Sequence, residues 1–270
     1  MIKKESNAKY HASKPVSKSR LFRMSVSPEW FHYCETHPQP KTESMIFGSA
    51  FHKLVLEPRY FFREFAILPP CDRRTKEGKE IYANAVAKAK RKTIITNEIY
   101  ETALAMSKKI SSDPLASVLL RNGTAELSYY TVDELTGMKW KARPDMTRML
   151  KNGGVIVDLK SCQKADTESF TRQAISLGYD LQAAMYKDAV EKETGVHHDF
   201  VFIAIEKEPP YLINILQADE FMIRRGQEKF REYMGIYSEC SKTGNWYGYN
   251  GFSGSVNNLS LPAWMLKEYE

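Results

Sequence analysis

The sequence predicts an α/β protein with a central mixed β-sheet flanked by helices. Three observations support this fold class. The first 122 residues carry several segments with apolar residues at helical spacing. Residues 124–217 then hold five short runs rich in β-branched and aromatic residues. One long helical segment interrupts these runs, as expected for a mixed sheet with an inserted helix.

Five helices are expected before residue 122. Ser19 caps the first, and Ser27 followed by Pro28 opens the second. The third carries His52 in its middle, the fourth is basic and rich in alanine, and Pro114 stops the fifth. They are expected within residues 17–35, which hold two helices, and within 42–58, 72–92 and 97–113.

The strand-like runs occupy residues 124–132, 137–145, 155–159, 199–206 and 211–217. The sequence DELTG predicts a hairpin turn between the first two. A long helix is expected from Glu168 to Thr194, with Gly178 as a kink and Gly195 as its cap. A final amphipathic helix precedes an aromatic and glycine-rich tail, residues 244–255. The tail is either a loop packed by its own aromatic side chains or an intersubunit contact.

We expect one elaborated domain. Residues 1–14 are polar and rich in lysine, which predicts a flexible basic arm able to touch a phosphate backbone. The domain itself would cover residues 15–270. It would consist of a helical N-terminal part (15–122), a sheet core (123–217), and a C-terminal helix and tail (218–270).

Composition sets limits on the class of protein. With 43% hydrophobic and 27% charged residues, the 270-residue chain is ordinary for a globular protein. A net charge of +6 permits a polyanionic partner such as DNA without proving one. The four cysteines lie far apart, so neither a zinc ribbon nor a disulfide framework is indicated. The chain has no signal-peptide core and no long apolar run, which predicts a cytoplasmic protein without membrane contact.

The stretch from residue 141 to 163 carries the strongest chemical signal. Side chains alternate faces along a strand, so Asp158 and Lys160 point to the same side of the apolar run around Val157. A tight turn at Gly153 would bring the preceding segment, with Asp145, alongside. Two neighbouring carboxylates repel unless a cation lies between them, and Mg²⁺ prefers carboxylate oxygens. The alternative is a pair of ordinary salt bridges at strand ends.

Four further residues could complete a site, although each has an ordinary explanation. His52 could be a satisfied core histidine, and Glu126 a solvated strand residue. Gln182 and Tyr186 lie four residues apart and therefore share a helix face, which could be plain helix surface. Their order along the chain, together with the two acids, is more informative than any one of them.

The combined series resembles the RecB-like branch of the PD-(D/E)xK nucleases, and within it the RecE (exonuclease VIII) type of exonuclease domain from prophage recombination systems. The resemblance spans nearly the whole chain and implies a restriction-endonuclease-like core. It rests on the segments GSAFH (48–52) with LVLEP, Glu126, RPD (143–145), DLK (158–160) and QAAMY (182–186).

The resemblance also implies roles for these residues. His52, Asp145, Asp158 and the main-chain carbonyl of Leu159 would ligate Mg²⁺, for which Mn²⁺ could substitute. Glu126 would act directly or through a ligated water. Lys160 would orient or deprotonate the attacking water and help to neutralise the phosphate, while Gln182 and Tyr186 would line the groove.

The implied activity is a Mg²⁺-dependent exodeoxyribonuclease. It would degrade the 5′ strand of linear double-stranded DNA and leave a 3′ overhang for a single-strand annealing protein of RecT type. The resemblance further implies a ring-shaped homo-oligomer, with a tetramer favoured over a trimer, in a bacterial or phage-encoded system.

Basic residues provide candidate DNA contacts. Arg73, Arg74, Lys76 and Lys79 form a dense stretch that could hold phosphates or could be a solvated face. Lys141 and Arg143, on the polar face of the second strand, are further candidates. No recognition-helix motif is present, so contacts to the DNA backbone are expected rather than sequence readout.

Three competing interpretations are open to different degrees. The iron–sulfur branch of the same superfamily needs a cluster of three cysteines near the C-terminus, and Cys240 stands alone there. A restriction-type endonuclease shares the acid and lysine core and stays possible. An inactive DNA-binding subunit also stays open, although the complete set of candidate residues argues against it.

Overall fold

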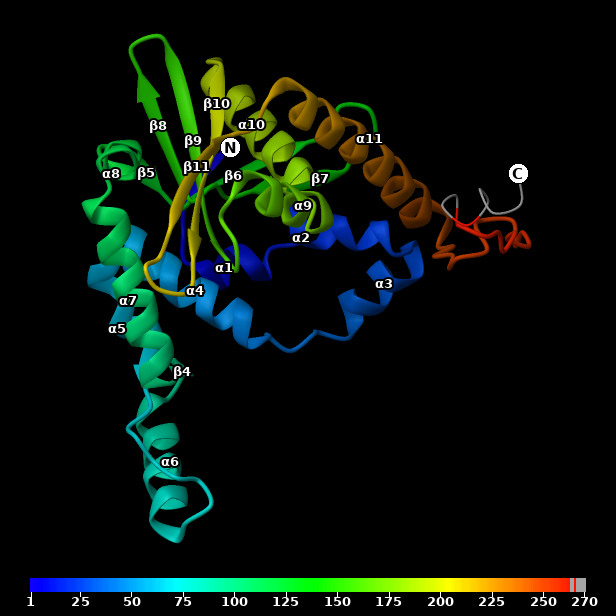
Figure 1. Cartoon of the computed structure of the whole chain (residues 1–270). Helices are drawn as coiled ribbons and strands as arrows, with labels where there is room; N and C mark the ends of the chain where they lie inside the picture. The colour runs from blue at the N-terminus through cyan, green and yellow to red at the C-terminus, as the bar shows by residue number, and fades with distance from the viewer. Residues whose placement is uncertain (263–264, 266–270) are drawn as a thin grey trace.

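Two mixed sheets flanked by helices form the body of the molecule, which confirms the predicted α/β class (Figure 1). The computed structural model describes residues 1–262 and 265. The larger sheet has the strand order β11 (Ile213–Gln217), β10 (His198–Glu206), β9 (Gly153–Cys162), β8 (Met146–Leu150) and β5 (Thr124–Ala125). The smaller has the order β1 (Ile2–Lys4), β6 (Leu127–Val132), β7 (Lys139–Ala142) and β2 (Val16–Ser17).

The helices and the remaining strands surround these sheets. A two-stranded sheet pairs β3 (Phe65–Ile67) with β4 (Thr93–Ile95). Two short 3-10 helices are η1 (Phe22–Ser25) and η2 (Pro58–Tyr60). The α-helices are α1 (Asn7–Ala12), α2 (Lys18–Leu21), α3 (Pro28–Thr36), α4 (Glu43–Leu56), α5 (Phe61–Glu64), α6 (Lys76–Ala89), α7 (Asn97–Ser112), α8 (Pro114–Leu120), α9 (Thr167–Ser176), α10 (Tyr179–Thr194) and α11 (Glu220–Thr243).

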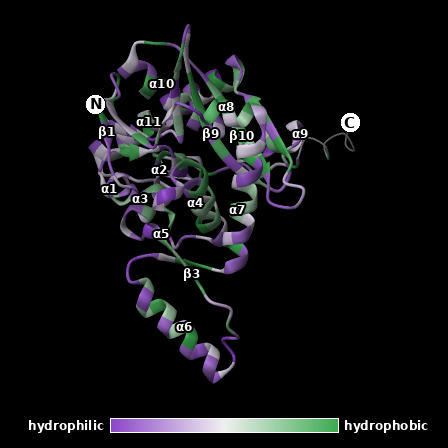
Figure 2. Cartoon of the chain, turned by 90° about the vertical axis from the view of Figure 1, so that its left-hand side faces the viewer, coloured by the Kyte–Doolittle hydropathy of each residue, from purple (hydrophilic) through white to green (hydrophobic). Residues whose placement is uncertain are grey.

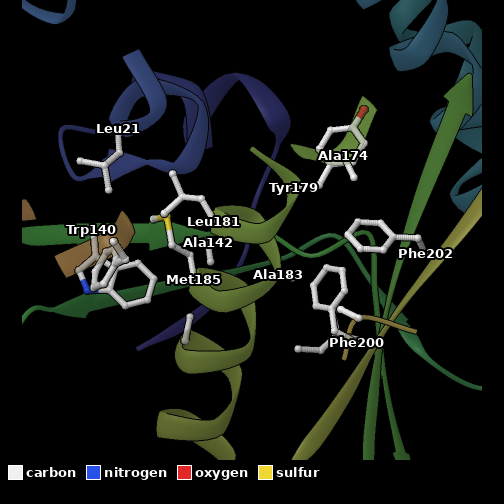
Figure 3. Packing of buried hydrophobic residues seen from close by; sticks show 14 of the residues in the cluster. Leu21, Trp140, Ala142, Ala174, Tyr179, Leu181, Ala183, Met185, Phe200 and Phe202 are labelled. Atoms are coloured by element: carbon white, nitrogen blue, oxygen red, sulfur yellow. The ribbon is translucent and has the colours of Figure 1, made fainter. Parts of the chain in front are cut away.

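The central strands β9 and β10 run parallel and are covered on both faces. Ile156, Phe200 and Phe202 point to one face, where they join a cluster that includes residues of α10 and α11 (Figure 3). Val157 and Leu159 point to the other face, where they pack with residues of α4 and α7. The predicted alternation along β9 is therefore confirmed, and both faces of the strand are held rigidly by apolar contacts.

One of the predicted strands is divided between the two sheets, and one strand of the larger sheet was not predicted. The first run breaks at Glu126, so that β5 belongs to the larger sheet and β6 to the smaller. The second run, predicted over 137–145, contains β7 of the smaller sheet and ends as an irregular segment at 143–145, after which the unpredicted strand β8 joins the larger sheet. Strand β8 continues to Leu150 and turns directly into β9. The hairpin turn predicted between β6 and β7 is present, since these strands pair antiparallel around it.

The predicted long helix is also two helices. Gly178 adopts a left-handed φ of +65° and separates α9 from α10. A Cβ atom at this position would lie 2.4 Å from the ring of Phe22, so only glycine fits both the backbone and the packing. The kink expected at this glycine is thus a complete break, which re-aims α10 toward the centre of the sheet.

The first fourteen residues do not form the loose arm that their polar composition predicts. Strand β1 pairs with β6, and the hydroxyl of Tyr130 donates a hydrogen bond of 2.6 Å to Glu5. Helix α1 buries Tyr10 against the body. Pairing with a strand more than 120 residues away satisfies the backbone of this segment, and a local reading of composition cannot detect such a partner.

Lys141 is the residue that fastens α1. Its ammonium is buried and donates hydrogen bonds to the carbonyl of Tyr10 and to the carbonyl and hydroxyl of Ser13, the last two at 2.9 Å. We expect Lys141→Met to lower the free energy of unfolding by about 2 kcal/mol, because one buried and two partly buried hydrogen bonds to the N-terminal segment are lost. Chemical denaturation would measure this, and limited proteolysis should cut the N-terminal segment sooner.

The control for that prediction is Lys139→Met on the same strand, where the side chain is exposed. That change should alter the unfolding free energy by less than about 0.5 kcal/mol. Equal stability of the two variants would show that Lys141 does not anchor α1.

Helix α6 projects from the body on the stalk formed by β3 and β4, as both views show (Figures 1 and 2). Thr75 caps the helix through its hydroxyl, which accepts a hydrogen bond from the amide of Gly78. Most of its side chains are exposed, and Figure 2 shows hydrophilic residues along its length. None of the described helices is long and apolar enough to cross a membrane.

Candidate active site

The candidate site lies where the chain passes from one sheet to the other. The break between β5 and β6 places one acid there, and the break between β7 and β8 places a second. The remaining residues of the site come from β9 and from the two helices that cover its faces, α10 and α4. The residues brought together are His52, Glu126, Asp145, Asp158, Lys160, Gln182 and Tyr186.

Asp145 connects α4 to β9. Its Oδ1 lies 3.2 Å from Nδ1 of His52, and its Oδ2 accepts a hydrogen bond of 2.7 Å from the amide of Leu159. Burial opposes ionisation of Asp145, but His52, Lys160 and the Leu159 amide outweigh it and lower the pKa of this carboxyl. Burial likewise disfavours the charged form of His52, yet the Asp145 carboxylate raises the pKa of the ring.

Glu126 occupies a backbone conformation that few residues other than glycine adopt, with φ at +58°. Its amide donates to the carbonyl of Asp145 at 3.1 Å, which holds the two breaks together. Burial, followed by the charge of Asp145, raises the pKa of the Glu126 carboxyl, while the Arg143 guanidinium opposes the rise. This strained conformation is maintained by the surrounding contacts, which fix the Glu126 carboxyl at the junction of the two sheets.

His52, Glu126 and Asp145 form a cluster able to hold a metal ion. Their ligand atoms all lie within 4.8 Å of one another, and this is the one such group found among the described residues. Two carboxylates and an imidazole suit a divalent ion such as Mn²⁺ or Mg²⁺. After burial, the charge of Asp145 is the next cause of the raised pKa of Glu126, and a bound cation would relieve this repulsion. The residues therefore fit a divalent ion.

Asp158 belongs to a second, adjoining group. Its carboxylate accepts hydrogen bonds from Lys160 and from the side-chain amide of Gln182, and it is 1% exposed. Burial, with a further contribution from Asp145, raises the pKa of Asp158 to about 6, although Lys160 opposes the rise. The sequence predicts that Asp158 and Asp145 share an ion, but in the described structure Asp158 lies outside the three-residue cluster.

Lys160 is held as a cation. Burial alone would lower the pKa of its ammonium, but Asp158 and Asp145 raise it above the ordinary value. The ammonium also lies 4.7 Å from the centre of the Tyr179 ring and 5.9 Å from that of Phe202. Packing and charge thus fix a positive group beside two buried carboxylates.

A cavity of about 210 Å³ opens onto the cluster. Tyr186 lines it, and burial raises the pKa of its hydroxyl well above the ordinary value, so this residue stays neutral. Helix α1 supplies part of the wall, which the sequence did not indicate because its contacts with the body are long-range. The lining residues not predicted from the sequence are Asn7, Tyr10, His11, Ser49, Lys53 and Glu64.

Comparison with known families decides the relationship of this chain. Residues 22–258 match the family described as a PDDEXK-like domain of unknown function, DUF3799. The chain belongs to this PDDEXK-like family. The match runs from η1 through α11 and contains every residue of the candidate site from His52 to Tyr186.

One solved structure agrees with this assignment at the level of the fold. A protein from Eubacterium rectale described as a "Putative exonuclease" aligns over 98% of both chains, with a TM-score of 0.61 and 16% identity. A phage related exonuclease from Haemophilus somnus 129PT aligns over 88% of this chain and 100% of its own, with a TM-score of 0.34 and 12% identity. The second likeness is too distant to carry an argument. No curated protein matches the chain.

Of the residues predicted to contact DNA, only Arg143 lines the cavity of the PDDEXK-like domain. Its Nε lies 2.6 Å from Oε2 of Glu126 without the alignment of a hydrogen bond. Within the described part of the chain, Nε and Nη1 are buried and have no hydrogen-bond partner. A buried guanidinium with unused donors at a cavity suits an anionic ligand such as phosphate.

The other predicted contacts lie elsewhere in the PDDEXK-like domain. Lys141 is buried and fully engaged by α1, so the prediction that it binds DNA is not supported by its position. The basic stretch Arg73, Arg74, Lys76 and Lys79 is exposed at the start of α6. Arg74 is paired with Asp72, and the guanidinium of Arg73 lies 4.2 Å from the ring centre of Tyr82.

Proposed function

We propose that this chain is a metal-dependent nuclease that degrades linear double-stranded DNA from its ends. The observation that carries the proposal is the meeting of a three-residue metal cluster with the Asp158–Lys160 pair inside a PDDEXK-like fold. The exonuclease description of the Eubacterium rectale structure with the same fold supports action at ends. A restriction-type endonuclease and an inactive DNA-binding subunit are the alternatives.

His52, Glu126 and Asp145 would hold a Mg²⁺ or Mn²⁺ ion. Asp158 and the carbonyl of Leu159 are proposed as additional ligands. The Leu159 amide faces Asp145, and in an extended strand the carbonyl of the same residue faces the same edge. Strand β8 begins at Met146, opposite Val157, so this edge of β9 has no β8 partner at Leu159. When bound, such an ion would lower the pKa of coordinated water and act as a Lewis acid toward a phosphate oxygen.

The remaining side chains act on the phosphate and on one another. Lys160 brings a fixed positive charge to the developing negative charge in a buried site, where such a charge is most effective. Gln182 holds Asp158 in place through its amide. Tyr186 stays neutral and offers a hydroxyl to a bound phosphate or sugar. Arg143 offers its unused donors to a phosphate oxygen.

The finer properties are proposed from the resemblance of the sequence to RecE-type exonuclease domains. Cleavage would proceed 5′ to 3′ and leave a 3′ overhang for a RecT-like annealing protein in prophage-type recombination. Residues 15–270 would form one domain within a ring-shaped homo-oligomer, a tetramer or a trimer, in the bacterial cytoplasm. The exposed basic residues at the start of α6 would contact phosphates of the duplex.

The test is digestion of a linear duplex labelled at one 5′ end, with and without Mg²⁺, beside a covalently closed circle. We expect loss of the 5′ label from the linear DNA only when the metal is present, with the circle intact. Chelation should stop the reaction because the cluster then lacks its ion.

The other outcomes each favour a different function. Cleavage of the circle would identify an endonuclease. Retention of the 5′ label while the linear DNA is shortened would overturn the polarity. Binding of DNA without cleavage under Mg²⁺ and Mn²⁺ would identify an inactive subunit.

A further inference from the structure

The outer face of α3 carries a row of stacked aromatic rings. Trp30 and Tyr33 stack with ring centres 5.7 Å apart and planes within 17°. Tyr33 and His37 continue the row at 4.1 Å and 7°. Spacings of three and four residues place these rings on one side of the helix. Trp30 is 39% exposed and Tyr33 is 46% exposed, so flat aromatic surface faces solvent without covering from the described part of the chain.

A groove of about 420 Å³ runs beside this row. It is lined by Val26, Ser27, Glu29, Trp30, Tyr33 and, from the segment after α11, Tyr249. Three of its six lining residues are therefore aromatic. Tyr249 is 78% exposed, and nothing in the described part of the chain fills the space between it and α3.

Specific contacts hold the segment before Tyr249 against α3. Trp246 stacks on Phe31 at 5.5 Å and on His32 at 4.8 Å, which fastens the segment after α11 to α3. The amide of Glu29 donates to the carbonyl of Tyr247 at 3.0 Å. The tail that begins at residue 244 is thus packed by its aromatics up to Tyr247, and Tyr249 follows at the groove.

The groove is connected with the candidate active site through α2 and η1. The ring of Tyr179 lies 4.7 Å from the ammonium of Lys160 and 5.6 Å from that of Lys18. Lys18 begins α2, which continues through η1 to Val26. Val26 lines the groove, so α2 and η1 form the stretch of chain between the contacts near the candidate active site and the groove.

We propose that this groove binds unpaired bases of single-stranded DNA, the strand that separates from its partner at the candidate active site. Paired bases in a duplex are covered by their neighbours, whereas unpaired bases stack readily on exposed aromatic side chains. The choice of DNA as ligand rests on the proposed nuclease function. Among the residues that the structure describes, Glu29 is the only carboxylate that lines the groove and no cation lines it, so stacking would dominate over charge.

The experiment compares wild type, Trp30→Ala and Trp30→Phe for binding to a short labelled oligothymidylate and to an end-capped duplex, with EDTA present to prevent cleavage. Trp30→Ala should weaken binding of the single strand about 5- to 150-fold, since stacking contributes about 1–3 kcal/mol per base. Trp30→Phe keeps a flat ring and should stay within about threefold of wild type. Binding of the duplex should not change.

Phe221→Ala is the matched control, because Phe221 is an exposed aromatic residue on α11. It should bind both DNAs as wild type does. A wild-type affinity for the single strand in Trp30→Ala would overturn the proposal. So would a change in the sedimentation mass of Trp30→Ala with unchanged DNA binding, since the groove would then be a contact between copies of the chain.

The binding of single-stranded DNA in the groove and the proposed nuclease function can be disproved independently of each other. If wild type does not cleave DNA under any divalent ion but binds oligothymidylate in a Trp30-dependent manner, the nuclease proposal falls and the groove stands. If the chain degrades linear DNA normally and Trp30→Ala binds the single strand as wild type does, the groove proposal alone falls.

Discussion

Replacing Asp158 with asparagine is expected to lower the rate of DNA cleavage at least about 10³-fold, which corresponds to about 4 kcal/mol of transition-state stabilisation. Asparagine has nearly the same shape and keeps an oxygen for the Gln182 amide. It lacks the negative charge that faces Lys160 and that is proposed to bind the ion. The loss therefore acts on chemistry and leaves the packing around β9 in place.

The same variant should stay folded. Burial raises the pKa of Asp158 to about 6, above its ordinary value, so stability falls as the pH rises from that ordinary value to about 6, and the full cost of the buried charge persists above about 6. Removing the charge relieves this cost, while losing the ion pair with Lys160 opposes the gain. We expect the free energy of unfolding to stay within about 1 kcal/mol of wild type at neutral pH.

The measurement is the initial rate on linear duplex, together with the unfolding transition and duplex binding in EDTA. Asp199→Asn on the neighbouring strand β10 is the matched control, because its side chain is 56% exposed. It should cleave as wild type does. A rate for Asp158→Asn within about tenfold of wild type would remove Asp158 from the catalytic machinery.

Replacing Lys160 with methionine is expected to reduce cleavage about 10²- to 10³-fold while metal binding persists. Methionine fills a similar volume but supplies no charge, and the ammonium of Lys160 is held as a cation by Asp158 and Asp145. Without it, negative charge that develops on the phosphate lacks its buried counter-charge. The His52, Glu126 and Asp145 cluster does not include Lys160 and should still bind Mn²⁺.

Rate and metal affinity are therefore measured on the same preparation, by cleavage assay and by calorimetric titration with Mn²⁺. Lys164→Met, at an exposed position shortly after β9, serves as the control and should leave both quantities unchanged. An unaltered rate in Lys160→Met would mean that Lys160 only pairs with Asp158. Loss of Mn²⁺ binding would instead mean that this lysine shapes the metal cluster.

Local periodicity was enough to predict the residues that lie on regular elements. Alternation along β9 placed Asp158 and Lys160 on one face, and the two separate hydrophobic clusters confirm it. Helical spacing placed Gln182 and Tyr186 together on α10, where the first contacts Asp158 and the second lines the cavity. These relations depend only on the geometry of one strand or one helix.

Positions at breaks could not be predicted in this way. The sequence places Glu126 and Asp145 within continuous strands, whereas the structure holds both where the chain changes sheets. After the change, β6 and β7 pair with the N-terminal strands β1 and β2, while β5 and β8 pair with each other beside β9. Lys141 was predicted to contact DNA for the same reason: its burial depends on α1, which is distant in sequence.

The sequence by itself therefore determined the α/β class, the faces of β9 and α10, and the set of residues available for chemistry. Only the tertiary structure decided that His52, Glu126 and Asp145 form one cluster, that Asp158 faces Lys160 and Gln182, and that α1 and the aromatic tail complete the walls. The physical reason is the range of the interactions. Side-chain direction along one element follows from backbone geometry, whereas breaks, burial and charge pairing depend on contacts between distant segments.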